Sequence, residues 1–211
     1  MIFYDSLPAP SPRRVRLFIA EKGVDIETRY IDITKNEQLT EEFKAKNPYC
    51  TVPVLEIDSG TCLTETLAIC HYLESRHPQP NLMGADDEEK ALVIMWYDFV
   101  WNNGFAAAAE ALRNHVRLFE NRSVTGPHSF PQIPELAARG RTRTALFMQE
   151  LERRLGESGY IAGDRYTFAD INAFVFVEFA GWVKVKIEDD QINLRRWFDR
   201  IAMRPAIQAL S

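Results

Sequence analysis

The periodicity of the apolar residues changes once along this 211-residue chain, and that change limits the folds available to it. Up to about residue 77, short strand patterns alternate with helical patterns, whereas the remainder is almost entirely helical in pattern. Elements of such different kinds are typical of two domains with separate cores. We therefore predict an α/β domain followed by an all-α domain.

A proline-rich run separates the two patterns. Residues 78–84 read Pro-Gln-Pro-Asn-Leu-Met-Gly and cannot continue a helix, because proline lacks an amide hydrogen and clashes with the preceding turn. We predict a first domain over residues 1–77, a linker over 78–87 and an all-helical domain over 88–211.

The first domain is expected to open with a β-α-β unit and to end with two antiparallel strands and a helix. The turn signal Asp58-Ser59-Gly60 separates those two strands. The expected strands are 2–4, 27–33, 52–57 and 61–63, and the expected helices are 13–23, 39–46, 65–77, 86–119, 134–155 and 168–183. An irregular loop is expected over 120–134.

Charge and cysteine content exclude several classes of function. The net charge is −5 without a sustained basic run, so no nucleic-acid partner is expected. No stretch reaches about 18 apolar residues and the first residues lack a signal-peptide pattern, so we expect no membrane partner and a cytoplasmic location. The three cysteines lack the spacing of a structural disulfide or zinc site, and no metal is expected.

Pro53 stands at the start of an apolar strand. Proline there removes a donor from the sheet, which favours an edge or a cis turn that leaves the backbone of Val52 exposed to an extended ligand. An ordinary proline at a strand entry is the alternative interpretation.

The segment Thr64-Glu65-Thr66 marks the change from a strand to a helix. Thr64 is placed to cap the helix, while Thr66 presents its hydroxyl and amide to a carboxylate at the positive helix end. Glu65 can accept a hydrogen bond from a ligand ammonium group. Ordinary helix-start chemistry is the alternative.

Taken in order, several motifs resemble those of the cytosolic glutathione transferases. They are Ser11-Pro12-Arg13-Arg14-Val15-Arg16, Asn47-Pro48 with Thr51-Val52-Pro53-Val54-Leu55, Leu63-Thr64-Glu65-Thr66-Leu67-Ala68-Ile69, Ile161-Ala162-Gly163-Asp164 with Thr167-Phe168-Ala169-Asp170, and Arg204-Pro205-Ala206. The resemblance covers nearly the whole chain. It implies a thioredoxin-like first domain that binds glutathione as cosubstrate, without a prosthetic group. It also implies a helical second domain that binds an electrophile, and a homodimer.

Carried over to this sequence, the resemblance implies that Val52 pairs its backbone with the cysteinyl part of glutathione beside a cis Pro53. Glu65 and Thr66 are then expected to hold the γ-glutamyl end. Gln38 and Thr51 fall where many members contact the glycine carboxylate, although neither is basic here.

Family members usually place a Ser, Cys or Tyr activator just after the first strand. Alignment on the arginines puts Ala9 at that position, and Ser11 two residues later has the pattern of a helix N-cap followed by Pro12. The chain therefore resembles an atypical fungal and bacterial subgroup that lacks this activator. That subgroup stabilises the thiolate with the first helix N-terminus and a water held by the second domain.

The second domain offers candidates for holding the water that stabilises the thiolate and for lining the electrophile pocket. Among polar residues of the long helical pattern, namely Asn102, Asn103, Arg113, Asn114 and His115, the imidazole of His115 is the most versatile water-holding group. Trp101 and Phe105 are the candidates for lining the electrophile pocket. A surface histidine and core aromatic residues are the alternatives. None of the three cysteines has the pattern of a reactive nucleophile, and Thr167 with Asp170 is assigned to a capping box.

The resemblance thus implies a detoxifying transferase that activates the glutathione thiol for attack on a small hydrophobic electrophile, with peroxide reduction or isomerisation as side activities. The alternative is a non-catalytic binding or assembly module with the same fold.

Overall fold

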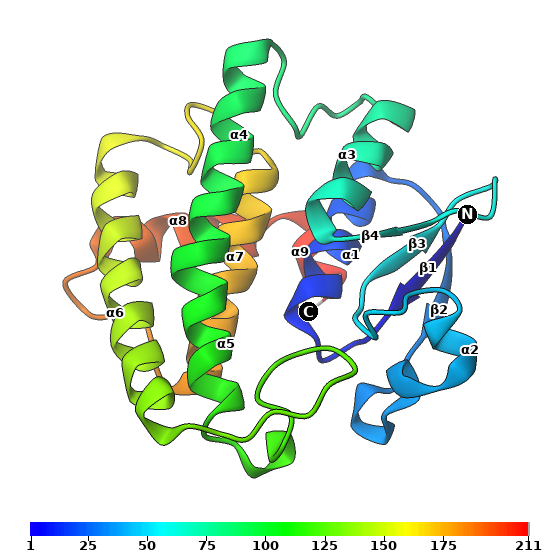
Figure 1. Cartoon of the computed structure of the whole chain (residues 1–211). Helices are drawn as coiled ribbons and strands as arrows, with labels where there is room; N and C mark the ends of the chain where they lie inside the picture. Colours follow the sequence, from blue (N-terminus) through cyan, green and yellow to red (C-terminus); the bar gives the residue numbers. More distant parts are fainter. Residues whose placement is uncertain (211) are drawn as a thin grey trace. The chain divides into compact units, whose positions relative to one another are not determined.

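The computed structural model describes residues 1–210, and the chain forms two compact units. The first contains Met1–Pro80 together with Val124–Ser129, and the second contains Asn81–Ser123 and Phe130–Ser211. The first unit is therefore built from two separate stretches of sequence (Figure 1). Among the described residues, no helix is long and apolar enough to cross a membrane.

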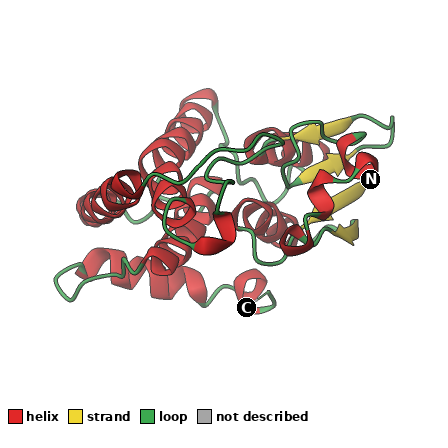
Figure 2. Ribbon diagram, turned by 60° about the horizontal axis from the view of Figure 1, so that its bottom comes forward, coloured by secondary structure: helices red, strands yellow, loops and turns green. Residues whose placement is uncertain are grey.

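Four strands form the sheet of the first unit (Figure 2). Strand β1 (Ile2–Asp5) lies between β2 (Glu27–Tyr30) and β3 (Val54–Glu56), and β4 (Cys62–Thr64) forms the edge beyond β3. β1 runs parallel to β2 because a helix connects them, and antiparallel to β3. The predicted turn at residues 58–60 joins the antiparallel strands β3 and β4 and is confirmed.

Helices cover the two faces of this sheet. Helix α1 (Pro10–Lys22) packs against α3 (Thr66–Arg76), and Figure 1 shows α2 (Glu41–Lys44) on the other side of the sheet. Phe43 of α2 packs edge-on against Tyr4, with ring centroids 6.2 Å apart. This sheet with helices on both faces confirms the predicted thioredoxin-like domain.

Several expected elements of the first unit are shorter than the sequence pattern indicates: the strand expected over 52–57 is Val54–Glu56, and two others change more. The second strand ends at Tyr30 rather than residue 33, and residues 33–35 form a 3₁₀ turn. The polar helix expected over 39–46 is reduced to a 3₁₀ turn, Glu37–Leu39, and the single α-helical turn Glu41–Lys44. Asn36 between the two 3₁₀ turns has a left-handed conformation, with φ of 64°, which prevents a continuous helix.

The second unit is a helical bundle, as predicted. Its helices are α4 (Asp87–Val100), α5 (Ala106–Arg113), α6 (Pro134–Glu157), α7 (Phe168–Ala180), α8 (Ile192–Ala202) and α9 (Pro205–Gln208), with short 3₁₀ turns at Arg117–Phe119 and Gly181–Val183. Helix α7 is buried along almost its whole length and forms the centre of the bundle.

The continuous helix expected over 86–119 was wrong. It consists of α4, a π-helical segment η3 (Trp101–Phe105), and α5, which ends at Arg113. Gly104 lies in the π-helical segment, and a Cβ there would come within 2.8 Å of the Phe176 ring and 3.0 Å of Phe147. Close packing on α6 and α7 therefore accompanies the change in helical geometry.

The predicted capping box at the start of α7 is confirmed. The backbone N–H of Thr167 donates to Asp170, and the Asp170 carboxylate also accepts from the amide of Ile161 and from Nε1 of Trp197, at 3.0 and 2.9 Å. Burial raises the pKa of Asp170 to about 6, although these donors act in the opposite direction. Asp170 thus connects the start of α7 with α8 and has a structural role.

Candidate functional site

The turn that precedes β3 is held by a single buried amide. Nδ2 of Asn47 donates to the carbonyl and hydroxyl oxygens of Thr51, both at 2.9 Å, and Oδ1 accepts from the amide of Tyr49. This Asn47 turn, residues 47–51, leads into the Val52–Pro53 bond, which is cis. Within residues 1–210, the backbone N–H and C=O of Val52 have no hydrogen-bond partner. An extended ligand can therefore pair with them.

The start of α3 lies close to the same edge of the sheet. Because Val54 lies opposite Thr64, the chain segments before β3 and after β4 leave the sheet at the same end. Glu65 follows with a left-handed φ of 66° and an exposed carboxylate, and Thr66 is buried at the first helical position. A carboxylate can bind the amides of this first turn, which lack partners within the helix.

Thr64 does not cap α3, contrary to the sequence interpretation. It still belongs to β4, where it lies opposite Val54, and Glu65 takes the N-cap position without a side-chain cap. The sheet pairing extends one residue further than the pattern of the sequence suggested. Consequently the side chain of Glu65 stays available to a ligand.

Helix α1 begins beside the start of α3. The hydroxyl of Thr66 lies 3.5 Å from the carbonyl oxygen of Ser11, so the N-termini of α1 and α3 meet. Ala9 is the N-cap of α1, and Pro10 rather than Pro12 takes the first helical position.

The prediction that Ser11 is the N-cap is therefore wrong. A residue before proline prefers extended backbone, and Ala9 before Pro10 has φ −84° and ψ 132°. Ser11 sits inside the first turn, where its hydroxyl accepts from Nη2 of Arg14 at 2.9 Å. Because Pro10 and Pro12 have no N–H, Ser11 carries the only amide donor of the first three helical positions.

Other groups near the end of β1 are engaged or shielded. The hydroxyl of Tyr4 donates to Glu56 at 2.8 Å. The pKa of Tyr4 is raised, chiefly by burial and secondly by the neighbouring Glu56 carboxylate. Ser6, directly after β1, is 1% exposed, and its hydroxyl has no partner among the described residues. The burial of Ser6 depends on tertiary packing and could not be predicted from the sequence.

Gln38 and Thr51, the two polar residues expected near the glycine end of glutathione, differ in their hydrogen bonding. Gln38 is 5% exposed and its Oε1 has no hydrogen-bond partner in the described chain. The hydroxyl of Thr51 already accepts from Asn47. Gln38 thus has an unused acceptor, whereas the Thr51 hydroxyl keeps its O–H donor, which is the kind of group that a carboxylate needs.

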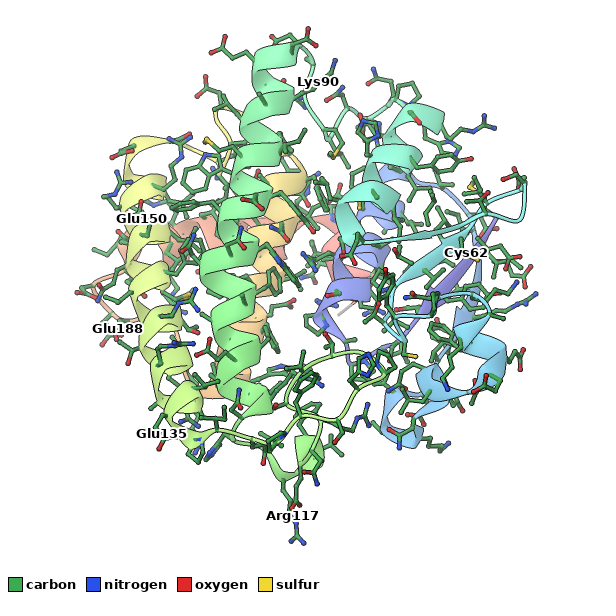
Figure 3. All side chains as sticks on the ribbon, in the orientation of Figure 1. Cys62, Lys90, Arg117, Glu135, Glu150 and Glu188 are labelled. Atoms are coloured by element: carbon green, nitrogen blue, oxygen red, sulfur yellow. The ribbon has the colours of Figure 1, made fainter. Side chains whose placement is uncertain are left out.

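The cysteines are free thiols and are poorly suited to nucleophilic chemistry. Cys70 is fully buried, and burial raises its pKa well above the ordinary value. Cys62 on β4 (Figure 3) also has a raised pKa, chiefly through burial and then through the charge of Glu56. Both shifts disfavour the reactive thiolate.

The second unit contains a chain of neighbouring aromatic rings. Phe105 is 2% exposed and lies 6.0 Å from the ring of Trp101 and 6.0 Å from that of Phe179, which in turn lies 5.4 Å from Trp182. Trp101 and Trp182 are 39% and 53% exposed. Phe105 therefore supports the accessible Trp101 from within the core, and the sequence pattern did not single out Trp182.

His115 lies in the turn after α5 and is exposed. The neighbouring candidates are engaged: Asn103 donates to the carbonyl of Phe99, Asn114 donates to that of Glu110, and Arg113 donates to those of Arg122 and Ser123. Within residues 1–210, no group of three or more His, Cys, Asp or Glu side chains could hold a metal ion.

The chain thus combines a thioredoxin-like domain, in which the backbone of Val52 is open, with a helical bundle. Comparison with known proteins agrees. Residues 9–76 match the family "Glutathione S-transferase, N-terminal domain", and residues 107–205 match "Glutathione S-transferase, C-terminal domain".

Individual relatives match over the whole chain. Glutathione S-transferase 2 of Saccharomyces cerevisiae is 32% identical over 100% of this chain and 89% of its own length. The crystal structure of Gtt2 from the same yeast superposes with a TM-score of 0.91 at 30% identity and full coverage of both chains. A glutathione S-transferase domain-containing protein of Marinobacter aquaeolei gives a TM-score of 0.90 at 34% identity, covering 98% of this chain and 100% of that one. This chain belongs to the glutathione S-transferase family and is an enzyme of that kind, which favours the transferase over the non-catalytic module.

Proposed function

We propose that the protein binds glutathione along the edge formed by Val52, Glu65 and Thr66 and transfers the glutathionyl group to a small hydrophobic electrophile by forming a bond between the thiolate sulfur and the electrophile. The observation that carries this proposal is the unpaired backbone of Val52, together with the exposed side chain of Glu65 at the N-cap of α3. In this arrangement the cysteinyl backbone of glutathione pairs with Val52. The γ-glutamyl carboxylate accepts from the first amides of α3, and its ammonium donates to Glu65.

We propose further that the sulfur lies at the N-terminus of α1. The contact between Thr66 and Ser11 supports this placement, because it brings the start of α1 to the γ-glutamyl site. The backbone amide of Ser11 then donates to the thiolate, while its hydroxyl accepts from Arg14. Ser11 acts through its amide, which explains how Ala9 can occupy the usual activator position.

Only a modest free energy is needed to stabilise the bound glutathione thiolate. Lowering a thiol pKa from about 8.5 to about 6.5 takes roughly 2.7 kcal/mol of preference for the thiolate. A helix N-terminus contributes about 0.3 to 2 kcal/mol and a hydrogen bond to a charged group about 1.5 to 3 kcal/mol. The Ser11 amide and the α1 dipole can therefore supply most of the shift. We also propose that His115 holds a water molecule that stabilises the thiolate. If it does, His115→Ala should raise the pKa of the bound thiol.

For the electrophile we propose the aromatic surface that ends in Trp101, supported by Phe105. A half-exposed indole on a rigid aromatic base can bind a small hydrophobic molecule without a large loss of side-chain entropy. Peroxide reduction and isomerisation are proposed as further reactions of the same thiolate.

We also propose that the protein is a homodimer. Apolar side chains on α4 are unusually exposed, with Ile94 at 45%, Met95 at 50% and Phe99 at 43%, and Phe99 lies against Phe147 of α6. Pairing of this surface between two copies would remove it from water. The three free cysteines support a reducing, cytoplasmic location, and detoxification is the proposed role.

Calorimetric titration of glutathione into the wild-type protein and a Thr66→Val variant tests the site. Saturable binding to the wild type that weakens in the variant is expected. A protein that binds no glutathione, or two proteins that bind it equally, would contradict the proposed position.

A further inference from the structure

The connection between α5 and α6, residues 114–133, is longer than the roughly 12 to 15 residues beyond which irregular loops are uncommon unless they function or are disordered. It is not loosely attached. Nε2 of Gln132 donates to the carbonyls of Arg113 and Val116 at 2.7 and 2.8 Å, and the amide of Ile133 donates to Asn114 at 2.9 Å. These bonds fix both ends of the connection within the second unit.

A second set of bonds closes the loop further out. The amide of Ser123 donates to the carbonyl of Phe130 at 3.2 Å, and its hydroxyl donates to the carbonyl of Pro131 at 2.8 Å. Arg113 donates to the carbonyl of Ser123, and its guanidinium packs over the ring of Phe119. Burial lowers the pKa of Arg113 to about 10, so this group is held inside the structure while still charged at neutral pH.

The six residues beyond this closure, Val124–Ser129, belong to the first unit, and we call them the strap. Gly126 in the strap has a φ of +114°, and a Cβ on it would lie 3.6 Å from the carbonyl oxygen of Tyr49. The strap therefore packs on the Asn47 turn, residues 47–51, which leads directly into Val52.

The glycine end of glutathione carries a carboxylate. Most basic side chains of the first unit are not available to bind it. Its lysines and several arginines are already in ion pairs, namely Arg16–Asp5, Lys22–Glu74, Arg29–Glu27, Lys35–Asp32, Lys44–Glu41 and Lys46–Glu56. Arg13 and Arg14 also interact with other groups. Arg76, His71 and His77 lie in or after the second half of α3, away from its N-terminus.

His128 of the strap is the basic side chain left by this elimination. It is exposed, and within residues 1–210 its side chain has no hydrogen-bond or ion-pair partner. A tripeptide held at Thr66 by its γ-glutamyl end and at Val52 by its middle extends its glycine end away from α3. We propose that the strap forms a wall of the glutathione site and that His128 donates a hydrogen bond to the glycine carboxylate.

This inference rests on the proposed function, and the test separates the two. Calorimetry compares glutathione with γ-glutamylcysteine, which lacks the glycine, in the wild type, in His128→Ala and in the matched histidine control His71→Ala, which changes an exposed residue of α3. His128→Ala is expected to weaken glutathione binding roughly tenfold and to leave γ-glutamylcysteine binding unchanged, because only glutathione carries the lost contact. His71→Ala is expected to bind both ligands as the wild type does.

Gly126→Val provides a second perturbation, since a side chain there is strained and meets the Tyr49 carbonyl. Gly126→Val, like His128→Ala, should reduce the ratio of glutathione affinity to γ-glutamylcysteine affinity. Equal glutathione affinity of wild type and His128→Ala, or equal weakening of both ligands, would overturn the role of the strap while leaving the glutathione site intact. Absence of glutathione binding to the wild type would overturn both proposals.

Discussion

Replacing Glu65 by glutamine is expected to weaken glutathione binding about tenfold. The exposed carboxylate makes no cap bond to α3 and adopts the same left-handed backbone that the variant must adopt, so the fold should not change. A hydrogen bond to a charged group is worth about 1.5 to 3 kcal/mol, and a neutral one about 0.5 to 1.5 kcal/mol. The difference of about 1 to 1.5 kcal/mol corresponds to a factor of about 5 to 12. Glu65→Ala, which removes the whole group, should cost about 1.5 to 3 kcal/mol.

Isothermal titration at low and at moderate salt measures this loss, and a glutathione analogue without the α-amino group is the matched control. With that analogue, wild type and Glu65→Gln should bind alike, because the charged contact is absent from both. If Glu65→Gln weakened both ligands equally, Glu65 would not contact the ammonium group and the assigned orientation of glutathione would be wrong.

Three further outcomes are expected. Thr66→Val should lower glutathione affinity by about 0.5 to 1.5 kcal/mol in calorimetry, because its hydroxyl is lost; unchanged affinity would contradict this. Ser11→Ala should reduce the transferase rate less than tenfold but lower the free energy of unfolding in urea by about 1 kcal/mol, because buried Arg14 loses an acceptor. For Asp170, a folded pKa of about 6 against an ordinary 3.8 means that stability is gained as pH falls. Relative to Asp170→Asn, the wild type should gain about 2 kcal/mol between pH 7 and pH 4 in denaturant titrations; parallel pH profiles would contradict this.

Local patterns were sufficient to predict most of the architecture. The turn at residues 58–60 joins antiparallel strands as expected, and Thr167 with Asp170 forms the expected capping box. These features depend on neighbouring residues, so the sequence alone carries the information.

The errors occur where a choice between local signals depends on distant contacts. Ser11-Pro12 and Ala9-Pro10 are both plausible helix starts, and the structure uses the second. The π-helical segment at Gly104 depends on the rings of Phe176 and Phe147, which are far away in sequence. Likewise, nothing in the composition of the strap indicates that it joins the first unit.

Titration of the glutathione thiol in the bound complex, followed by ultraviolet absorbance of the thiolate, tests the central claim most directly. In the wild type and in Ser11→Ala we expect a thiol pKa near 6.5, roughly two units below the free thiol, because both retain the amide at position 11. Ser11→Pro removes that amide at a helical position that tolerates proline, and should raise the pKa by about one to two units, with thermal unfolding as the folding control. An increase of two units in Ser11→Ala, with no change in His115→Ala, would instead identify a conventional serine-type enzyme and contradict activation by the α1 backbone.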